Sequence, residues 1–175
     1  MNLPQLFQIQ KVLDERIVRE HQLGCRELLQ EKVLALRVEI GELANEWRGF
    51  KFWSTNQEAN RYVYGGLDEI ISRPLLEEYV DGLHFVLSIG LELEFDVELP
   101  VLAIEPIKWS SITEQFNSLF VADWDVYQFG DGGYFHEGLE LFIGLGEMLG
   151  FTWDQIETAY MEKNKVNHQR QDDGY

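Results

Sequence analysis

The chain has 175 residues, 45% of them hydrophobic, and is long enough to form one domain around a substantial core. Its formal net charge of −17 argues against nucleic acids and anionic membranes as partners, because no basic surface is available to displace their counterions. The single cysteine, Cys25, excludes an intramolecular disulfide. Since the sequence also lacks an N-terminal signal pattern and a long apolar run, we expect a soluble, cytoplasmic protein.

Apolar residues recur at helical spacing in six segments, which we expect to be helices: residues 3–21, 25–47, 74–93, 110–125, 134–149 and 152–167. Gly49 is the stop signal of the second segment. Ser72 or Arg73 caps the third, where the next residue is a proline that the first turn tolerates. Thr152 and Gln155 form a capping box at the start of the last segment.

The connections between these segments lack helical periodicity. Residues 54–66 are expected to be irregular and to be followed by a short helical turn over residues 67–71. Residues 94–108 are expected to be extended or looped, residues 130–133 to form a turn and residues 169–175 to be a polar tail. Because no repeat or second domain is visible, we predict a single all-α domain, a bundle of about five to six helices.

Two predicted helices each carry a pair of carboxylates three residues apart: Glu39 with Glu42, and Glu78 with Asp81. Residues at this spacing lie on one helix face, so two packed helices can bring four carboxylates together. Such acids repel one another in an apolar setting unless a cation lies among them, and oxygen ligands favour Mg²⁺. Each pair alone is also typical of a solvated helix, but apolar residues flank both pairs here.

A di-iron carboxylate bundle is the main alternative for these acids. It requires the spacing Glu-x-x-His on two helices, whereas only Asp81 and His84 approach that pattern. We therefore favour Mg²⁺ over iron and interpret His84 as a residue that supports the site or the core.

Positive charge and amides are concentrated near the C-terminus of this acidic chain. Lys163 and Asn167 share one helix face, and Arg170 follows about one turn later. A row of donors of this kind suits phosphate oxygens, although it is also typical of a solvated helix end that is favoured by the helix dipole.

Four stretches of the chain resemble a known family: residues 10–14, 42–53, 77–85 and 163–175. The two carboxylate pairs resemble the signature of the all-α nucleoside triphosphate pyrophosphatase superfamily, which includes MazG-type proteins. The four stretches resemble, more narrowly, the dimeric dUTPase family. The likeness covers nearly the whole chain. The two acidic pairs lie further apart in sequence than in compact superfamily members, which leaves the conformation of residues 54–72 open.

The resemblance implies a Mg²⁺-dependent dUTP diphosphatase that forms dUMP and pyrophosphate. The four carboxylates would hold two or more Mg²⁺ ions, and Glu42 would orient or deprotonate the attacking water. The implied phosphate-binding residues are Lys163, Asn167, Arg170 and Tyr175. The implied uracil-binding residues are Gln10, which reads the base, Asp14 beside it, and Trp47 or Trp53 as a stacking surface.

The resemblance also implies a homodimer. Six apolar residues of the fourth and fifth predicted helices exceed what one small core needs and are candidates for its interface: Phe116, Phe120, Trp124, Phe135, Leu139 and Phe142. Two alternative functions stay open: a related pyrophosphatase for another nucleotide such as dCTP, and a non-catalytic acidic helical module that binds a protein partner.

Overall fold

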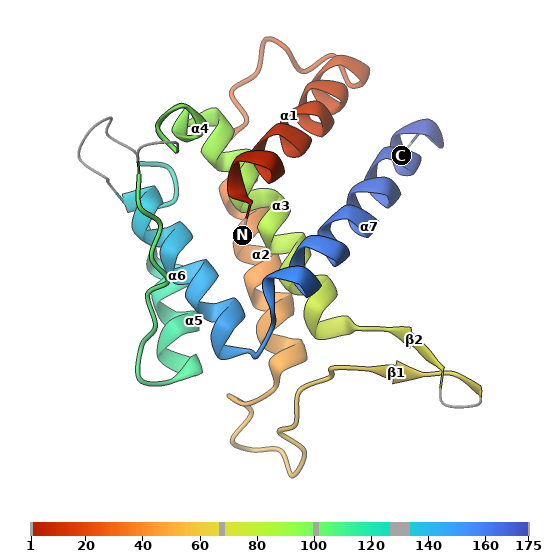
Figure 1. Cartoon of the computed structure of the whole chain (residues 1–175), viewed down its shortest axis with the longest axis vertical. Coiled ribbons are helices and arrows are strands. Elements are labelled where there is room, and N and C mark those ends of the chain that lie inside the picture. The colour runs from red at the N-terminus through yellow and green to blue at the C-terminus, as the bar shows by residue number, and fades with distance from the viewer. Residues whose placement is uncertain (1, 67–68, 100–101, 127–133, 175) are drawn as a thin grey trace.

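The computed structural model of the chain describes residues 2–66, 69–99, 102–126 and 134–174. In those residues it has seven helices and one two-stranded hairpin: α1 Leu3–Glu20, α2 Leu29–Trp47, β1 Val63–Tyr64, β2 Ile70–Ser72, α3 Pro74–Glu92, α4 Phe95–Glu98, α5 Ile112–Val121, α6 Tyr134–Met148 and α7 Trp153–Asp172 (Figure 1). The predicted all-α fold is therefore confirmed. In these ranges no helix combines the length and the apolar character needed to cross a bilayer.

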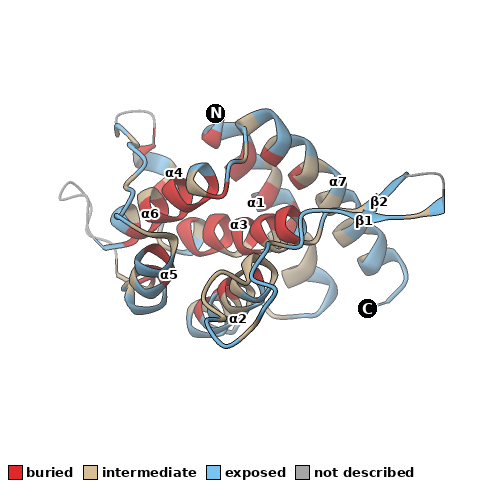
Figure 2. Cartoon of the chain, turned by 90° about the horizontal axis from the view of Figure 1, so that it is seen from below, coloured by how far each residue is buried: buried red, intermediate tan, exposed pale blue. Residues whose placement is uncertain are grey.

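Helix α3 is the centre of the bundle. Buried residues run along it, and α1, α2, α4, α6 and α7 all contact it (Figure 2). Burial on nearly all sides is typical of a core helix and explains its continuous apolar composition. At its start Pro74 needs no hydrogen-bond partner, and the N–H of the N-cap residue Arg73 donates to the carboxylate of Glu77.

Helices α1, α3 and α6 end within one residue of the predicted positions. Helix α7 begins with the predicted capping box of Thr152 and Gln155 but continues to Asp172, five residues beyond the predicted end. Contacts with α1 explain the extension: Arg16 donates to the backbone oxygen of His168 and pairs with the carboxylate of Asp172. Residues 169–172 are thus helical and not a free polar tail.

Two predicted helices are shorter in the structure. Helix α2 begins at Leu29, four residues after the predicted start, and its N-cap residue Leu28 gives no side-chain cap. Helix α5 spans Ile112–Val121 instead of residues 110–125, since Ser111 caps its first turn and Ala122 is already extended.

Helix α2 ends at Trp47, as predicted, but the residue that stops it is Arg48 and not Gly49. Arg48 adopts the left-handed conformation that ends α2, and its N–H donates to the oxygen of Ala44. Gly49 is still required for a different reason, because a Cβ atom there would lie 2.4 Å from the indole ring of Trp47.

The segment between α2 and α3 contains a hairpin that was not predicted. Val63 and Tyr64 pair antiparallel with Ile70–Ser72, and the hairpin projects from the bundle (Figure 1). The helical turn expected over residues 67–71 is therefore wrong at Ile70 and Ile71, while residues 67 and 68 lie outside the described part. Paired β-branched residues favour extended strands over helix and explain the difference.

Residues 94–108, expected to be extended or looped, contain the single helical turn α4. The fully buried ring of Phe95 holds this turn against the core, where it contacts the rings of Phe7 and Phe135. The turn predicted over residues 130–133 lies outside the described residues.

The apolar residues proposed for a dimer interface are mostly used within the chain itself. Five of the six are buried in its own core: Phe116, Trp124, Phe135, Leu139 and Phe142. Phe120 is the exception, since 38% of it is exposed. The five buried residues are therefore covered by the chain's own core and do not require a second chain to cover them.

Candidate active site

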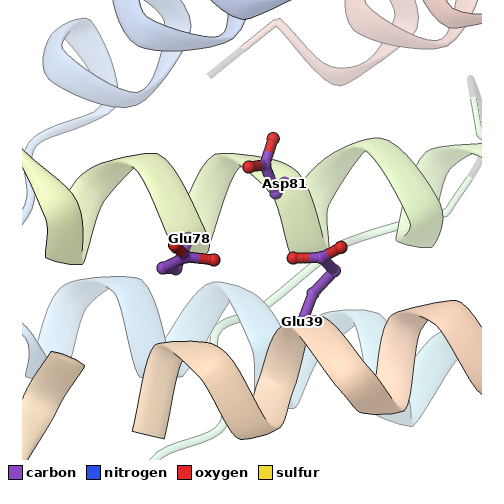
Figure 3. A group of neighbouring side chains, drawn as sticks. All are labelled: Glu39, Glu78 and Asp81. Atoms are coloured by element: carbon purple, nitrogen blue, oxygen red, sulfur yellow. The ribbon is translucent and has the colours of Figure 1, made fainter. Parts of the chain in front are cut away.

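Helices α2 and α3 bring three of the four predicted acids together. Glu39 projects from α2, and Glu78 and Asp81 project from one face of α3 (Figure 3). One carboxylate oxygen from each residue lies within 4.8 Å of those from both others, and all three residues are half-buried. We call these three residues the carboxylate cluster.

Glu42 is not part of the carboxylate cluster. It is exposed, one turn after Glu39 on α2, but it is close enough for its charge to raise the pKa values of Glu39 and Glu78. Glu42 therefore lies at the solvent side of the cluster.

The acids of the cluster do not ionise as they would in water. Burial, followed by the charges of neighbouring carboxylates, raises the pKa of Glu39 and that of Glu78 to about 7. Burial also raises the pKa of Asp81, although the hydrogen bond and charge of Lys163 oppose that shift. A bound cation would favour the ionised forms of all three.

The cluster fits a hard divalent cation such as Mg²⁺. It offers oxygen ligands from two rigid helices, and positive charge is already drawn to it. The ammonium of Lys163, on α7, lies 2.5 Å from Oδ2 of Asp81. This ammonium contacts the cluster directly, and the charge of Arg170 also acts on Asp81.

A cavity of about 540 Å³ adjoins the cluster between α1, α2, α3 and α7. Seven residues predicted from the sequence line it: Gln10, Asp14, Glu39, Asp81, Lys163, Asn167 and Arg170. The structure thus brings the predicted metal, phosphate and base residues to one space, although Glu42 and Glu78 are not in its lining. Tyr175, predicted to close over the phosphates, lies outside the described residues.

A hydrogen-bond network holds Gln10, which is only 3% exposed. Its amide nitrogen donates to Oδ1 of Asp14 (2.7 Å), so its oxygen faces the opposite way. That oxygen accepts from the hydroxyl of Tyr160 (2.7 Å) and from Nδ1 of His84 (2.8 Å). Because an amide oxygen only accepts, His84 carries its proton on Nδ1. Burial lowers the pKa of His84 to about 3, which keeps the ring neutral.

His84 therefore positions Gln10 through Nδ1, and its Nε2 is buried without a hydrogen-bond partner among the described residues. Its ring stacks on Tyr160 with the ring centroids 4.2 Å apart, which fixes α3 against α7. This supports the interpretation of His84 as a supporting residue.

The two tryptophans predicted to stack on a base do not line the cavity. Trp47 packs against Phe116 with the ring centroids 5.4 Å apart, and Trp53 is 65% exposed beside Phe52. Among the described phenylalanine, tyrosine and tryptophan residues, Phe85 lines the cavity, and sequence reasoning missed it as a site residue. Its position four residues after Asp81 could have indicated it, since residues at this spacing share a helix face.

Lys32 and Ser88 are further cavity residues that the sequence did not reveal. The hydroxyl of Ser88 donates to Oδ2 of Asp14, and the ammonium of Lys32 lies 3.5 Å from the same oxygen and 2.7 Å from Glu92. Each residue is ordinary in its own helix, and only the packing of α1, α2 and α3 brings them together.

The raised pKa values of Glu39 and Glu78 predict how stability depends on pH. Both groups have an ordinary pKa of 4.5 in the unfolded chain and a pKa of about 7 when folded. Their stabilising contribution is therefore complete below about pH 4.5 and is lost as the pH rises through about 7. In metal-free buffer we expect the wild-type Tm to fall between about pH 5 and pH 7 more steeply than that of Glu39→Gln. Thermal denaturation monitored by circular dichroism tests this, and parallel pH profiles for the two proteins would contradict it.

A family model described as dUTPase matches residues 2–175. A search of curated proteins found no match.

Proposed function

The chain belongs to the all-α dUTPase family and hydrolyses dUTP to dUMP and pyrophosphate, and we propose that it does so with Mg²⁺ bound at the carboxylate cluster. The observation that carries this proposal is the convergence of Glu39, Glu78 and Asp81 beside a cavity that also holds the row of C-terminal donors. Bound Mg²⁺ would neutralise charge on the triphosphate and lower the pKa of a water.

The residues around the cluster have separate tasks in this proposal. Lys163, Asn167 and Arg170 line the cavity from one face of α7 and donate hydrogen bonds to the phosphates. Glu42 lies at the solvent side of the cluster, where a carboxylate can reach and orient an attacking water. Its exposure supplies water access that the half-buried cluster acids lack.

The network around Gln10 supports a preference for uracil. The amide oxygen already accepts two hydrogen bonds, and one of the two amide hydrogens is donated to Asp14. The remaining N–H can donate to a carbonyl oxygen of uracil. In cytosine, an amino group replaces one of the two carbonyls, and two donors would then face each other without an acceptor. Phe85 is the aromatic surface available for the ring.

A panel of deoxynucleoside triphosphates tests this proposal. We expect Mg²⁺-dependent release of pyrophosphate from dUTP with a kcat/KM about a hundredfold or more above that for dCTP, the scale of discrimination that an unpaired buried polar group supplies. Equal turnover of dCTP would contradict the uracil preference. Unchanged dUTP turnover after removal of divalent cations with EDTA would contradict the metal site.

A homodimer in the cytoplasm is part of the same proposal. Helices α2 and α5 pack together and leave four apolar side chains exposed: Leu34, Val38, Phe120 and Val121. These residues, which include Phe120, are a better candidate interface than the five buried apolar residues considered from the sequence. Light scattering that gives the mass of one chain would contradict the dimer.

A further inference from the structure

We propose that Lys163 is an exchangeable cation of the carboxylate cluster: it neutralises Asp81 in the metal-free protein, and a divalent metal displaces it into the cavity, where it binds phosphate. Metal binding and triphosphate binding are coupled through this one side chain. This inference rests on the proposed metal site.

The contacts of Lys163 place its charge among the three acids. Its ammonium is 2.5 Å from Oδ2 of Asp81, and 24% of the lysine side chain and 19% of the aspartate side chain are exposed. The same positive charge also favours the ionised forms of Glu39 and Glu78. The charge of Lys163 thus acts on all three acids of the cluster, while its ammonium donates a hydrogen bond to Asp81.

One ammonium is an incomplete partner for this cluster. When all three acids are ionised, the charge of Lys163 balances one of the three negative charges, and Arg170 adds an electrostatic effect on Asp81. A divalent cation among the oxygens compensates more of this charge than the one ammonium does. The lysine bond also occupies an oxygen of Asp81 that would ligate the metal. Metal and ammonium therefore compete for the same group.

The structure gives Lys163 room to leave. It lines the cavity that holds Asn167 and Arg170, and it also lines a second cavity of about 550 Å³ beside the hairpin. Its flexible four-carbon stem can carry the ammonium away from Asp81 without movement of α7. Beside Asn167 the released ammonium joins the donors proposed for phosphate.

The competition has a consequence for binding in the absence of nucleotide. Removal of the ammonium eliminates the competitor, so the metal affinity rises. Because coupling between two bound groups is reciprocal, metal binding in turn releases Lys163 for phosphate. A fixed, structural Lys163–Asp81 pair would show neither effect.

Isothermal titration calorimetry with MgCl₂ and nucleotide-free protein tests the inference. We expect Lys163→Met to bind Mg²⁺ about tenfold more tightly than the wild type, in the usual range of coupling between sites. Lys165→Met is the matched control, because Lys165 is exposed on the same helix and its loss changes the net charge equally. Its affinity should stay within about twofold of the wild type.

Each other outcome overturns the inference. Equal or weaker Mg²⁺ binding by Lys163→Met contradicts the exchange but leaves the metal site intact. If Lys165→Met gains as much affinity as Lys163→Met, the effect is one of net charge alone. Absence of Mg²⁺ binding to all three proteins contradicts the metal site as well. Lys163→Gln is the second variant, and unfolding of both Lys163 variants that Mg²⁺ does not reverse would show a structural ion pair.

Discussion

Replacement of Glu78 by Gln is expected to lower kcat/KM for dUTP about a thousandfold, because loss of a metal ligand removes several kcal/mol of transition-state stabilisation. The same change should raise the Tm of the metal-free protein at pH 8. Burial and neighbouring charges raise the pKa of Glu78 to about 7, so its ionised form at pH 8 is disfavoured in the folded state. A neutral amide of the same shape relieves that cost.

Pyrophosphate release and thermal denaturation of the same preparations measure both effects. Glu137→Gln is the matched control, since this glutamate is exposed on α6 and is not part of the carboxylate cluster. Mg²⁺ should raise the Tm of the wild type more than that of Glu78→Gln. If Glu78→Gln keeps more than about a tenth of the wild-type activity, the assignment of Glu78 as a metal ligand is contradicted. A loss of activity of about tenfold or less corresponds to much less than the several kcal/mol that a metal ligand contributes.

Replacement of Gly144 by Ala is expected to destabilise the fold by about 3 kcal/mol or more. A Cβ atom at this position would lie 1.9 Å from the backbone oxygen of Ile107, and backbone cannot rotate away as a side chain can. The buried amide of Gln115 holds this approach in place by donating to the oxygens of Ile107 and Leu141.

For a chain of this size, such a loss corresponds to a decrease in Tm of about 10 °C. Gly24→Ala is the control, because nothing lies within 4 Å of the Cβ position there. Circular dichroism melting curves for both variants test the expectation. A Tm within about 2 °C of the wild type would mean that residues 102–111 can move away from α6 at little cost.

Local periodicity explains which parts of the fold were predictable. In α1, α3 and α6 the apolar residues repeat at helical spacing, and the helices end where the pattern ends. The hairpin and the last turn of α7 depend on partners elsewhere in the chain. Strand pairing joins Val63 to Ser72, and Arg16 from α1 holds the end of α7. Arg16 lies far from the end of α7 in sequence, so a short window of sequence does not reveal this contact. The two strands of the hairpin lie close together in sequence, but their pairing does not show in a helical periodicity pattern.

The sequence by itself determined the chemistry available to this protein: two pairs of acids on helix faces, a row of donors near the C-terminus and an amide on the first helix. Only the tertiary structure decided how these groups are used. It brought Glu39, Glu78 and Asp81 together, left Glu42 at the solvent side, and committed the oxygen of Gln10 to Tyr160 and His84. Spacing along a helix is set by backbone geometry, whereas the rotation of one helix against another is set by apolar side chains packed between them.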